Sequence, residues 1–318
     1  MSLERSESAP AVTVALLGSK EVGRELGKRG TVSDLTLFNS VRESQVVTYV
    51  EPTQFPDRLP PLLFALAMAD RALFFVSALD HEMAETAAAV DLFELPALIV
   101  VGPSLDVDQL NRALRGSSLE GAPRCVMDLL KVREIVEQWT APAVEGPVGV
   151  TLDHAFPVKG VGAVALGLVR QGTLRIHDTL RVYPTDRTVE VRSIQVQDVD
   201  VREAPTGRRV GVALKGIDTD ELARGQVLAP EGSMTVAQDI SPTGFQPCRY
   251  YRGKIVEGSS LHLLAGLQFV PARVVRLHKG VPELTTDRSI AYRTGDRGLL
   301  CDLSVASGPR LAGRLAMG

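Results

Sequence analysis

The sequence has few cysteines, few aromatic residues and no long apolar run. Its cysteines, Cys125, Cys248 and Cys301, lie far apart, which argues against a disulfide framework or a zinc site and fits a reducing cytoplasm. Aromatic residues make up 5% of the 318 residues, too few to favour a stacking platform for single-stranded nucleic acid. No apolar run approaches the roughly 20 residues of a membrane span. The polar N-terminus, MSLERSESAP, does not read as a signal peptide, so we expect a cytoplasmic protein.

Charge is unevenly distributed along the chain, although the net charge is only −3. Residues 1–145 hold 13 Lys and Arg against 21 Asp and Glu, which gives −8. Residues 146–232 hold 11 of each sign, and residues 233–318 hold 11 basic against 6 acidic residues, which gives +5. A basic C-terminal third is typical of a segment that meets phosphate groups, and a solvated Arg-rich surface is the alternative.

The first part of the chain alternates short apolar runs with helical patterns. The apolar runs have the composition of buried parallel strands. This alternation predicts a doubly wound α/β domain with right-handed crossovers, spanning residues 1–145. Its predicted strands are residues 12–17, 35–38, 46–50, 72–76 and 97–101.

The apolar period changes to two after a linker at residues 139–147. Short strands separated by glycine turns then predict two small β-barrels, at residues 146–232 and 233–318. In the first barrel, Val191 and Ile194 are both apolar although their side chains would point to opposite faces of a regular strand, which predicts a bulge or a bend between them. In the second barrel the predicted strands are residues 250–255, 260–264, 269–277, 298–305 and 311–316. The fold class is therefore α/β plus all-β.

The first predicted strand is followed by a loop with the spacing of a nucleotide phosphate loop. Residues 18–25 read GSKEVGRE, where the consensus is G-x-x-x-x-G-K-[ST]. Arg24 stands at the lysine position and Glu25 at the position of the Mg²⁺-binding hydroxyl, and a forked guanidinium does not replace a compact ammonium. Closely spaced glycines allow only one or two helical turns after the loop, so the helix that would face the phosphates is missing. A tight strand-to-helix turn is the alternative role of Gly18 and Gly23.

The middle third of the chain resembles domain 2 of the translational GTPases. The pattern lies in four stretches, which are 156–174 (FPVKGVGAVALGLVRQGTL), 191–195 (VRSIQ), 204–217 and 221–228. Residues 233–318 are similar to domain 3 of the same family, through RTGDR at 293–297 and RLAGRLA at 310–316. Within the family, the chain is most similar to elongation factor Tu and to the selenocysteine-specific elongation factor.

The resemblance implies GTP or GDP with Mg²⁺ as the cofactor, at positions that this chain has altered. Where the family has Asp-x-x-Gly-His, this chain reads Glu51-Pro-Thr-Gln54-Phe55. Only Asp106 remains of the guanine motif Asn-Lys-x-Asp, and a helix N-cap is its alternative role. We therefore expect no efficient GTPase, no catalytic residue and no resident cofactor. The vestigial cofactor-binding residues are Gly18, Gly23, Arg24 and Asp106.

In the family, domain 2 holds the aminoacyl end of tRNA and domain 3 grips its acceptor arm. The resemblance therefore implies that basic residues in the C-terminal two thirds meet RNA, although each is also explained as ordinary surface. These RNA-binding candidates are Lys159, Arg249, Arg252, Lys254, Arg273 and Arg276. Expected partners are tRNA, rRNA or the ribosome, and neither DNA nor a membrane. The five histidines lack metal-ligand spacing, so no metal site is predicted.

Three functions stay open from the sequence. The leading hypothesis is a translation-factor homologue that binds RNA, tRNA or ribosomal components without efficient GTP hydrolysis. The second is an active GTP-binding elongation factor of the selenocysteine-specific type with a divergent phosphate loop. The third is a protein-interaction scaffold, with a protein partner or a homodimer, that regulates translation.

Overall fold

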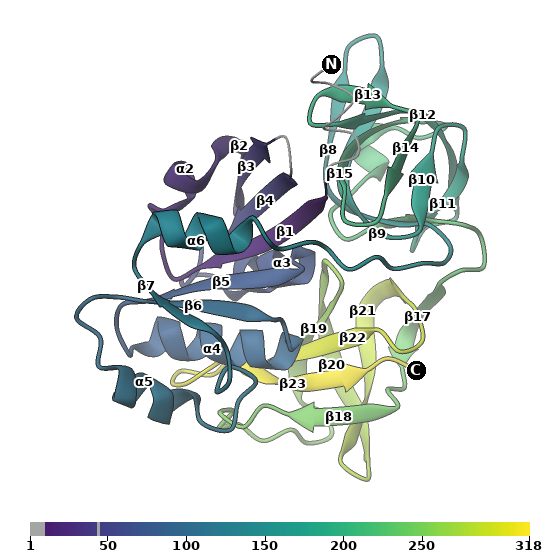
Figure 1. Cartoon of the computed structure of the whole chain (residues 1–318). Coiled ribbons are helices and arrows are strands. Elements are labelled where there is room, and N and C mark those ends of the chain that lie inside the picture. The colour runs from purple at the N-terminus through teal and green to yellow at the C-terminus, as the bar shows by residue number, and fades with distance from the viewer. Residues whose placement is uncertain (1–9, 43–44) are drawn as a thin grey trace. The chain divides into compact units, whose positions relative to one another are not determined.

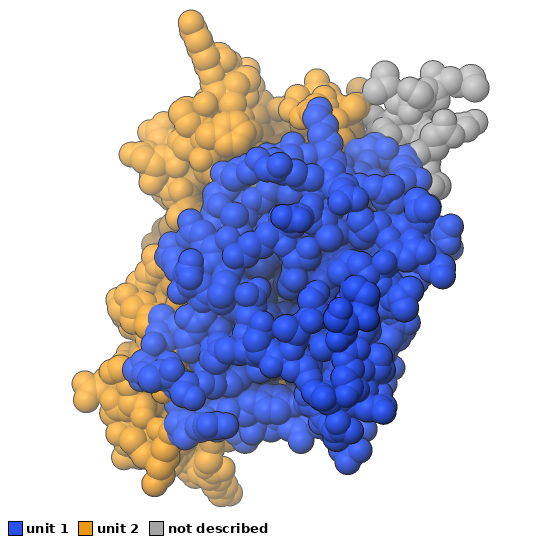
Figure 2. All heavy atoms as spheres, turned by 90° about the vertical axis from the view of Figure 1, so that its left-hand side faces the viewer, with its two compact units in different colours: residues 1–141, 247–253, 303–313 blue, residues 142–246, 254–302, 314–318 orange. Residues whose placement is uncertain are grey.

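The computed structural model describes residues 10–42 and 45–318 (Figure 1). All but the last residue of the polar N-terminal stretch, MSLERSESAP, lies outside the described residues. The chain divides into two compact units, coloured blue and orange in Figure 2. Unit 1 is Met1–Ala141, Pro247–Gly253 and Leu303–Gly313, and unit 2 is Pro142–Gln246, Lys254–Asp302 and Arg314–Gly318. Over the described ranges, no helix is both long and apolar enough to cross a membrane.

Unit 1 is built on a seven-stranded sheet with the strand order β2-β3-β4-β1-β5-β6-β7. The neighbours β4, β1, β5, β6 and β7 run parallel, and β2 and β3 extend the sheet as antiparallel strands. All five strands predicted for this part of the chain are present, and β2 and β7 were not predicted. The strands are β1 (Ala11–Leu17), β2 (Lys28–Val32), β3 (Thr36–Arg42), β4 (Gln45–Glu51), β5 (Arg71–Val76), β6 (Ala97–Val101) and β7 (Arg124–Val126).

Helices cover both faces of this sheet, as Figure 1 shows for α6 on one side and α3 and α4 on the other. Val132 and Val136 of α6 join one buried cluster with Leu16, Leu73 and Val100 of the strands. The side chains that alternate with these along each strand point to the other face of the sheet and are buried there as well. Burial on both faces is why the strands appear in the sequence as continuous apolar runs. The helices are α2 (Gly23–Leu26), α3 (Leu59–Met68), α4 (His81–Phe93), α5 (Val107–Leu114) and α6 (Leu129–Val136).

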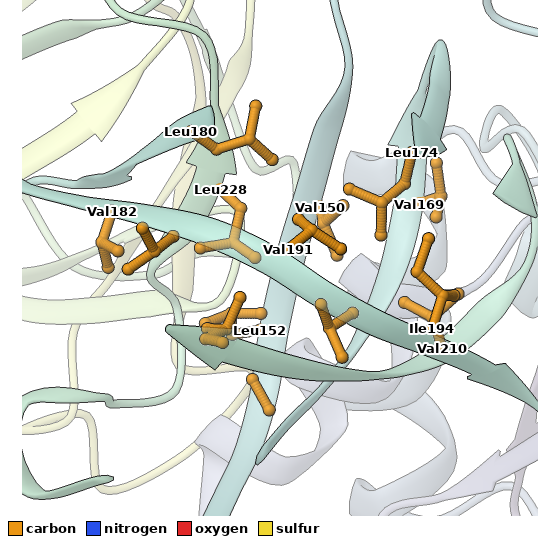
Figure 3. Close-up of a cluster of buried hydrophobic side chains, with 14 of the residues drawn as sticks. Val150, Leu152, Val169, Leu174, Leu180, Val182, Val191, Ile194, Val210 and Leu228 are labelled. Carbon is orange, nitrogen blue, oxygen red and sulfur yellow. The ribbon is translucent and has the colours of Figure 1, made fainter. Parts of the chain in front are cut away.

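Unit 2 begins with a barrel whose strand order is β11-β16-β8-β9-β15-β12-β13, closed by the pairing of β11 with β12. Its interior is filled by aliphatic side chains such as Val150, Val191 and Leu228 (Figure 3). Full burial of each such side chain contributes about 1.5–3 kcal/mol. The barrel strands are β8 (Gly149–Val158), β9 (Gly162–Gln171), β11 (Thr179–Tyr183), β12 (Arg187–Val196), β13 (Val199–Val201), β15 (Arg209–Lys215) and β16 (Val227–Ala229), with the short pair β10 (Thr173–Arg175) and β14 (Glu203–Pro205) and the single turn η1 (Thr219–Glu221).

The bulge predicted in this barrel is confirmed. The register of β12 against β15 shifts between Val191 and Ser193, so Val191 and Ile194 both point into the core. One extra residue on β12 therefore reverses the apolar parity along the strand, as the sequence indicates.

The C-terminal strands form a second seven-stranded antiparallel sheet with the order β17-β21-β20-β19-β22-β23-β18. Three of its predicted strands match closely and a fourth, 298–305, in its first half, but the prediction at residues 250–255 is wrong because this segment holds no strand. Its strands are β17 (Thr235–Ile240), β18 (Gly244–Pro247), β19 (Ser260–Ala265), β20 (Gln268–His278), β21 (Val281–Tyr292), β22 (Arg297–Cys301) and β23 (Leu311–Ala316). The α/β plus all-β fold class is confirmed.

Candidate functional site at the carboxyl edge of the parallel sheet

The carboxyl ends of β1, β4, β5 and β6 lie along one edge of the sheet in unit 1, because these strands are parallel neighbours. The loop at residues 18–25, the segment at 51–55, the loop before α4 and the loop at 102–106 all leave this edge. In open α/β sheets, ligands bind at this edge where the strand order reverses. Gly18, Gly23, Arg24 and Asp106, the residues predicted to bind a nucleotide, all lie in these loops.

The two loop glycines are required by packing. Gly18 has φ +75°, and a Cβ there would run into the carbonyl oxygen of Phe75 on β5. At Gly23 a Cβ would run into the ring of Phe38 on β3. Close approach of backbone to a neighbour is a common reason for glycine. The spacing of Gly18 and Gly23 is thus accounted for without a bound phosphate.

The helix after the loop is a single turn. α2 is four residues long, which agrees with the one or two turns predicted from its glycines. Val22 and Leu26 are buried in the core cluster that also holds Phe38. Arg24, the residue at the lysine position, is exposed. The loop is thus anchored by its own apolar side chains, and so short a helix supplies little of the macrodipole that favours phosphate.

Glu51 places a carboxyl group where the family has the aspartate that organises Mg²⁺. Glu51 is 6% exposed, and its Oε2 atom has no hydrogen-bond partner. Burial raises the pKa of Glu51 to about 7, although the nearby cations Lys20, Arg29 and Arg24 oppose the rise. Loss of hydration disfavours the charged form of a carboxyl group. At neutral pH this side chain therefore carries only part of a negative charge.

Two more acidic residues, Asp80 and Glu82, lie at the start of α4, and Glu82 is within the influence of Lys20. Asp80 caps this helix, since its Oδ1 accepts a hydrogen bond of 2.8 Å from the Met83 backbone N–H. Burial raises the pKa of Glu82, Lys20 lowers it and Asp80 raises it further. Lys20 thus acts on the carboxyl groups of both Glu51 and Glu82. Asp80 and Glu82 lie outside the nucleotide motifs of the family, although an Asp before an apolar helical pattern is an N-cap signal.

Two further motif positions have roles within the fold. Phe55, at the position of the family's water-positioning histidine, is 4% exposed and belongs to the core. Gln54, at the position of the γ-phosphate-sensing glycine, accepts a hydrogen bond of 3.1 Å from Nη1 of Arg58 through its Oε1. A buried phenyl ring has no group that orients water.

Asp106 has the N-cap role that the sequence left open. Its Oδ1 accepts hydrogen bonds from the backbone N–H groups of Asp108 (2.9 Å) and Gln109 (3.2 Å) at the start of α5. These bonds, with the Gln109 N–H first, lower the pKa of the Asp106 carboxyl. The one retained guanine-motif residue therefore has a structural task of its own.

The six RNA-binding candidates are all exposed. Arg249 and Arg252 belong to unit 1, and the other four belong to unit 2. The guanidinium of Arg249 stacks on the ring of Tyr250 at 5.3 Å, and Arg276 lies 3.9 Å from a carboxylate oxygen of Glu283. Lys159 sits in the turn between β8 and β9. Within the described parts of the chain, no group of three His, Cys, Asp or Glu side chains has the geometry of a metal site.

Comparison with known proteins identifies the family. The model of elongation factor Tu domain 2 matches residues 162–229, inside the first barrel. The uncharacterized protein MJ0325 of Methanocaldococcus jannaschii is 40% identical over 295 residues, which cover 92% of this chain and 95% of that protein. The selenocysteine-specific elongation factor of the same organism is 24% identical over 289 residues, 82% of this chain but only 61% of that protein.

The solved structures agree on the fold. Translation elongation factor SelB from Methanococcus maripaludis, in complex with the GTP analogue GppNHp, covers 97% of this chain and 79% of its own. Its TM-score is 0.84 at 19% sequence identity. A bacterial selenocysteine-specific elongation factor gives a TM-score of 0.76, covering 96% of this chain and 58% of its own. The resemblance seen in the sequence is thus confirmed, and this chain belongs to the translational GTPase family, in the group of elongation factor Tu and SelB.

Proposed function

We propose that this chain is a translation-factor homologue that binds RNA, as tRNA or within the ribosome, without an efficient GTPase switch. The observation that carries the proposal is the packing and charge of the residues at the carboxyl edge of the parallel sheet, where the loop at residues 18–25 lies. Its loop is packed onto Phe38 through Gly23, and the carboxyl of Glu51, whose pKa is raised by burial, stands where Mg²⁺ would be organised. We also propose a cytoplasmic location, where translation takes place.

Electrostatics supports the absence of an efficient GTPase. Phosphoryl transfer depends on the loop lysine, a bound Mg²⁺ and an oriented water. In this chain these parts are replaced by Arg24, Glu51 and the buried Phe55. Loss of one electrostatic group in a catalytic site typically costs about 3–4 kcal/mol, and the losses compound because Mg²⁺ is the largest local charge. Asp106, which caps α5, does not offset them.

The RNA-binding part of the proposal rests on the all-β segment. The match to elongation factor Tu domain 2 and the relatives named as elongation factors support a partner from the translation apparatus. Residues 233–318 carry a charge of +5, and cations such as Lys159 and Lys254 are exposed. Basic surface of this kind supplies the salt-dependent part of nucleic-acid affinity.

The test is filter binding of charged and uncharged tRNA to the full chain over a range of salt concentrations. We expect an affinity that falls steeply with salt, and a weaker slope in Lys159→Gln and Lys254→Gln. Arg175→Gln, which removes an exposed arginine paired with Glu203, is the matched control and should bind like the wild type. No salt-sensitive affinity for either tRNA, together with protein partners that resist ribonuclease, would favour the scaffold instead.

A further inference from the structure

A hollow of about 350 Å³ lies in unit 2 at the neighbouring strands β18, β23 and β22. Its volume is within the range of small-molecule sites. None of the eight described residues that line it is acidic. Its polar and aromatic lining is Phe245, Gln246, Arg297 and Arg314.

The walls of the hollow are fixed by backbone hydrogen bonds. The N–H of Thr243 donates to the carbonyl oxygen of Ala316 at 2.9 Å. The N–H of Gly295 donates to the carbonyl oxygen of Met317 at 2.9 Å, and the N–H of Met317 donates to the backbone carbonyl oxygen of Asp296 at 2.8 Å. The C-terminal strand is thereby held between the two segments that border the hollow, so the site is largely formed before a ligand arrives.

The side chains are suited to an anion attached to a flat ring. Arg314 is half-buried, and its Nη2 donates a hydrogen bond of 2.6 Å to Oε1 of Gln246. This bond holds the Arg314 guanidinium against the side chain of Gln246, whose amide Nε2 is a further hydrogen-bond donor. Arg297, the first residue of β22, adds a second, exposed guanidinium. The guanidinium of an arginine can bind two oxygens of one phosphate group at once. The half-buried ring of Phe245 offers a face on which a flat ring can stack.

We propose that this hollow binds one nucleotide unit, with its phosphate at Arg297 and Arg314 and its base against Phe245. The unit is either a free nucleotide or an unpaired nucleotide of a bound RNA. The RNA form of the proposal rests on the proposed function, since it names a contact through which the chain holds RNA. None of the six basic candidates from the sequence lies in this hollow.

The experiment follows backbone amide signals of the full chain by NMR while AMP, adenosine, inorganic phosphate or single-stranded oligo(A) RNA is added. We expect AMP and oligo(A) to shift the amides of Gly244, Gly295 and Leu315, with weaker shifts from adenosine or phosphate alone. Shifts with AMP but not oligo(A) support a free nucleotide, and shifts with both support an RNA nucleotide. No saturable shift with any of these probes overturns the proposal.

Variants separate the phosphate contact from the stacking contact. In filter binding of oligo(A), Arg297→Gln with Arg314→Gln should weaken binding about ten-fold and reduce the salt slope by about 0.7, since the contact of both arginines with one phosphate is lost. Phe245→Leu should weaken binding about five-fold and leave the slope unchanged, because stacking is not ionic. Arg288→Gln, an exposed arginine of β21 outside the hollow, is the control.

The outcomes keep this proposal apart from the proposed function. If the double variant binds oligo(A) as Arg288→Gln does, the hollow is not the RNA contact, while RNA binding by the chain stands. If the wild type binds no RNA but AMP still shifts the three amides, the proposed function fails and the hollow remains a nucleotide site.

Discussion

Glu85 of α4 and Arg310 form a buried, two-pronged ion pair within unit 1. Nη2 of Arg310 lies 2.6 Å from Oε2 of Glu85, and its Nε lies 3.0 Å from Oε1. The Arg310 backbone N–H also donates to Oε1 at 2.8 Å, and its Nη2 donates to the Pro56 carbonyl at 3.0 Å. The Glu85 side chain has no exposed surface. Residues 303–313 are thus held to the α/β sheet by a carboxylate that water does not reach.

Removing one member of this pair should be costly. We expect Glu85→Ala to lower the free energy of unfolding by about 3–5 kcal/mol, because it leaves the guanidinium of Arg310 half-buried without its counter-charge. Urea unfolding of the full chain measures the change. The control is Arg175→Ala, whose pair with Glu203 has both side chains more than half exposed and should contribute no more than about 1 kcal/mol. Equal effects of the two substitutions would contradict the importance given to the buried pair.

Glu51 should make stability depend on pH. The pKa of this carboxyl is about 7 in the folded chain and 4.5 as its ordinary value, so the folded state holds the proton more tightly. The stabilisation that this tighter proton binding gives the folded state is complete below pH 4.5 and is lost as the pH rises through 7. Glu51→Gln, which stays neutral, should therefore gain up to about 3 kcal/mol over the wild type between pH 4.5 and pH 8.

Urea unfolding of both proteins at pH 5 and pH 8 measures this difference. Glu25→Gln, an exposed carboxyl in the neighbouring loop, serves as the control and should track the wild type at both pH values. A Glu51→Gln variant whose stability relative to the wild type is the same at pH 5 and pH 8 would refute the burial of a neutral carboxyl at this edge.

Gly18 should tolerate no side chain. We expect Gly18→Ala to lower stability by at least about 2 kcal/mol, since both its positive φ and the Phe75 carbonyl oppose a Cβ. Gly266→Ala isolates the effect of φ, because Gly266 has φ +58° with open space around the Cβ position. Thermal unfolding compares the two variants. If they lose the same stability, the close approach of the loop to β5 has no energetic role.

The sequence predicts the elements of this fold better than their contacts. Buried strands can be recognised in the sequence as apolar runs. The bulge can be located from Val191 and Ile194, because side-chain direction alternates strictly along a strand and these two positions break the alternation. The strand β21 was missed because Thr285, Thr286 and other polar residues interrupt its apolar pattern, although Thr286 is buried and bonded to backbone carbonyls.

Partners distant in sequence leave no such pattern. Glu85 and Arg310 are 225 residues apart, and nothing in the period of either segment pairs them. The contact of Phe38 with Gly23 is equally invisible, since the glycine spacing of the loop is the same whether it surrounds a phosphate or accommodates a ring. The predicted strands therefore place the motif residues at one edge of the sheet, while the cationic and acidic surroundings of these residues emerge only from the structure.

The most direct measurement is titration calorimetry of the full chain with GTP and with GDP in the presence of Mg²⁺. Our expectation for both nucleotides is no saturable heat that requires Mg²⁺ and Arg24 at concentrations up to about 1 mM, which corresponds to a binding free energy at this loop weaker than about −4 kcal/mol. Saturable, Mg²⁺-dependent binding of GTP that is lost in Arg24→Ala would contradict it, and would establish the loop at residues 18–25 as a working phosphate site.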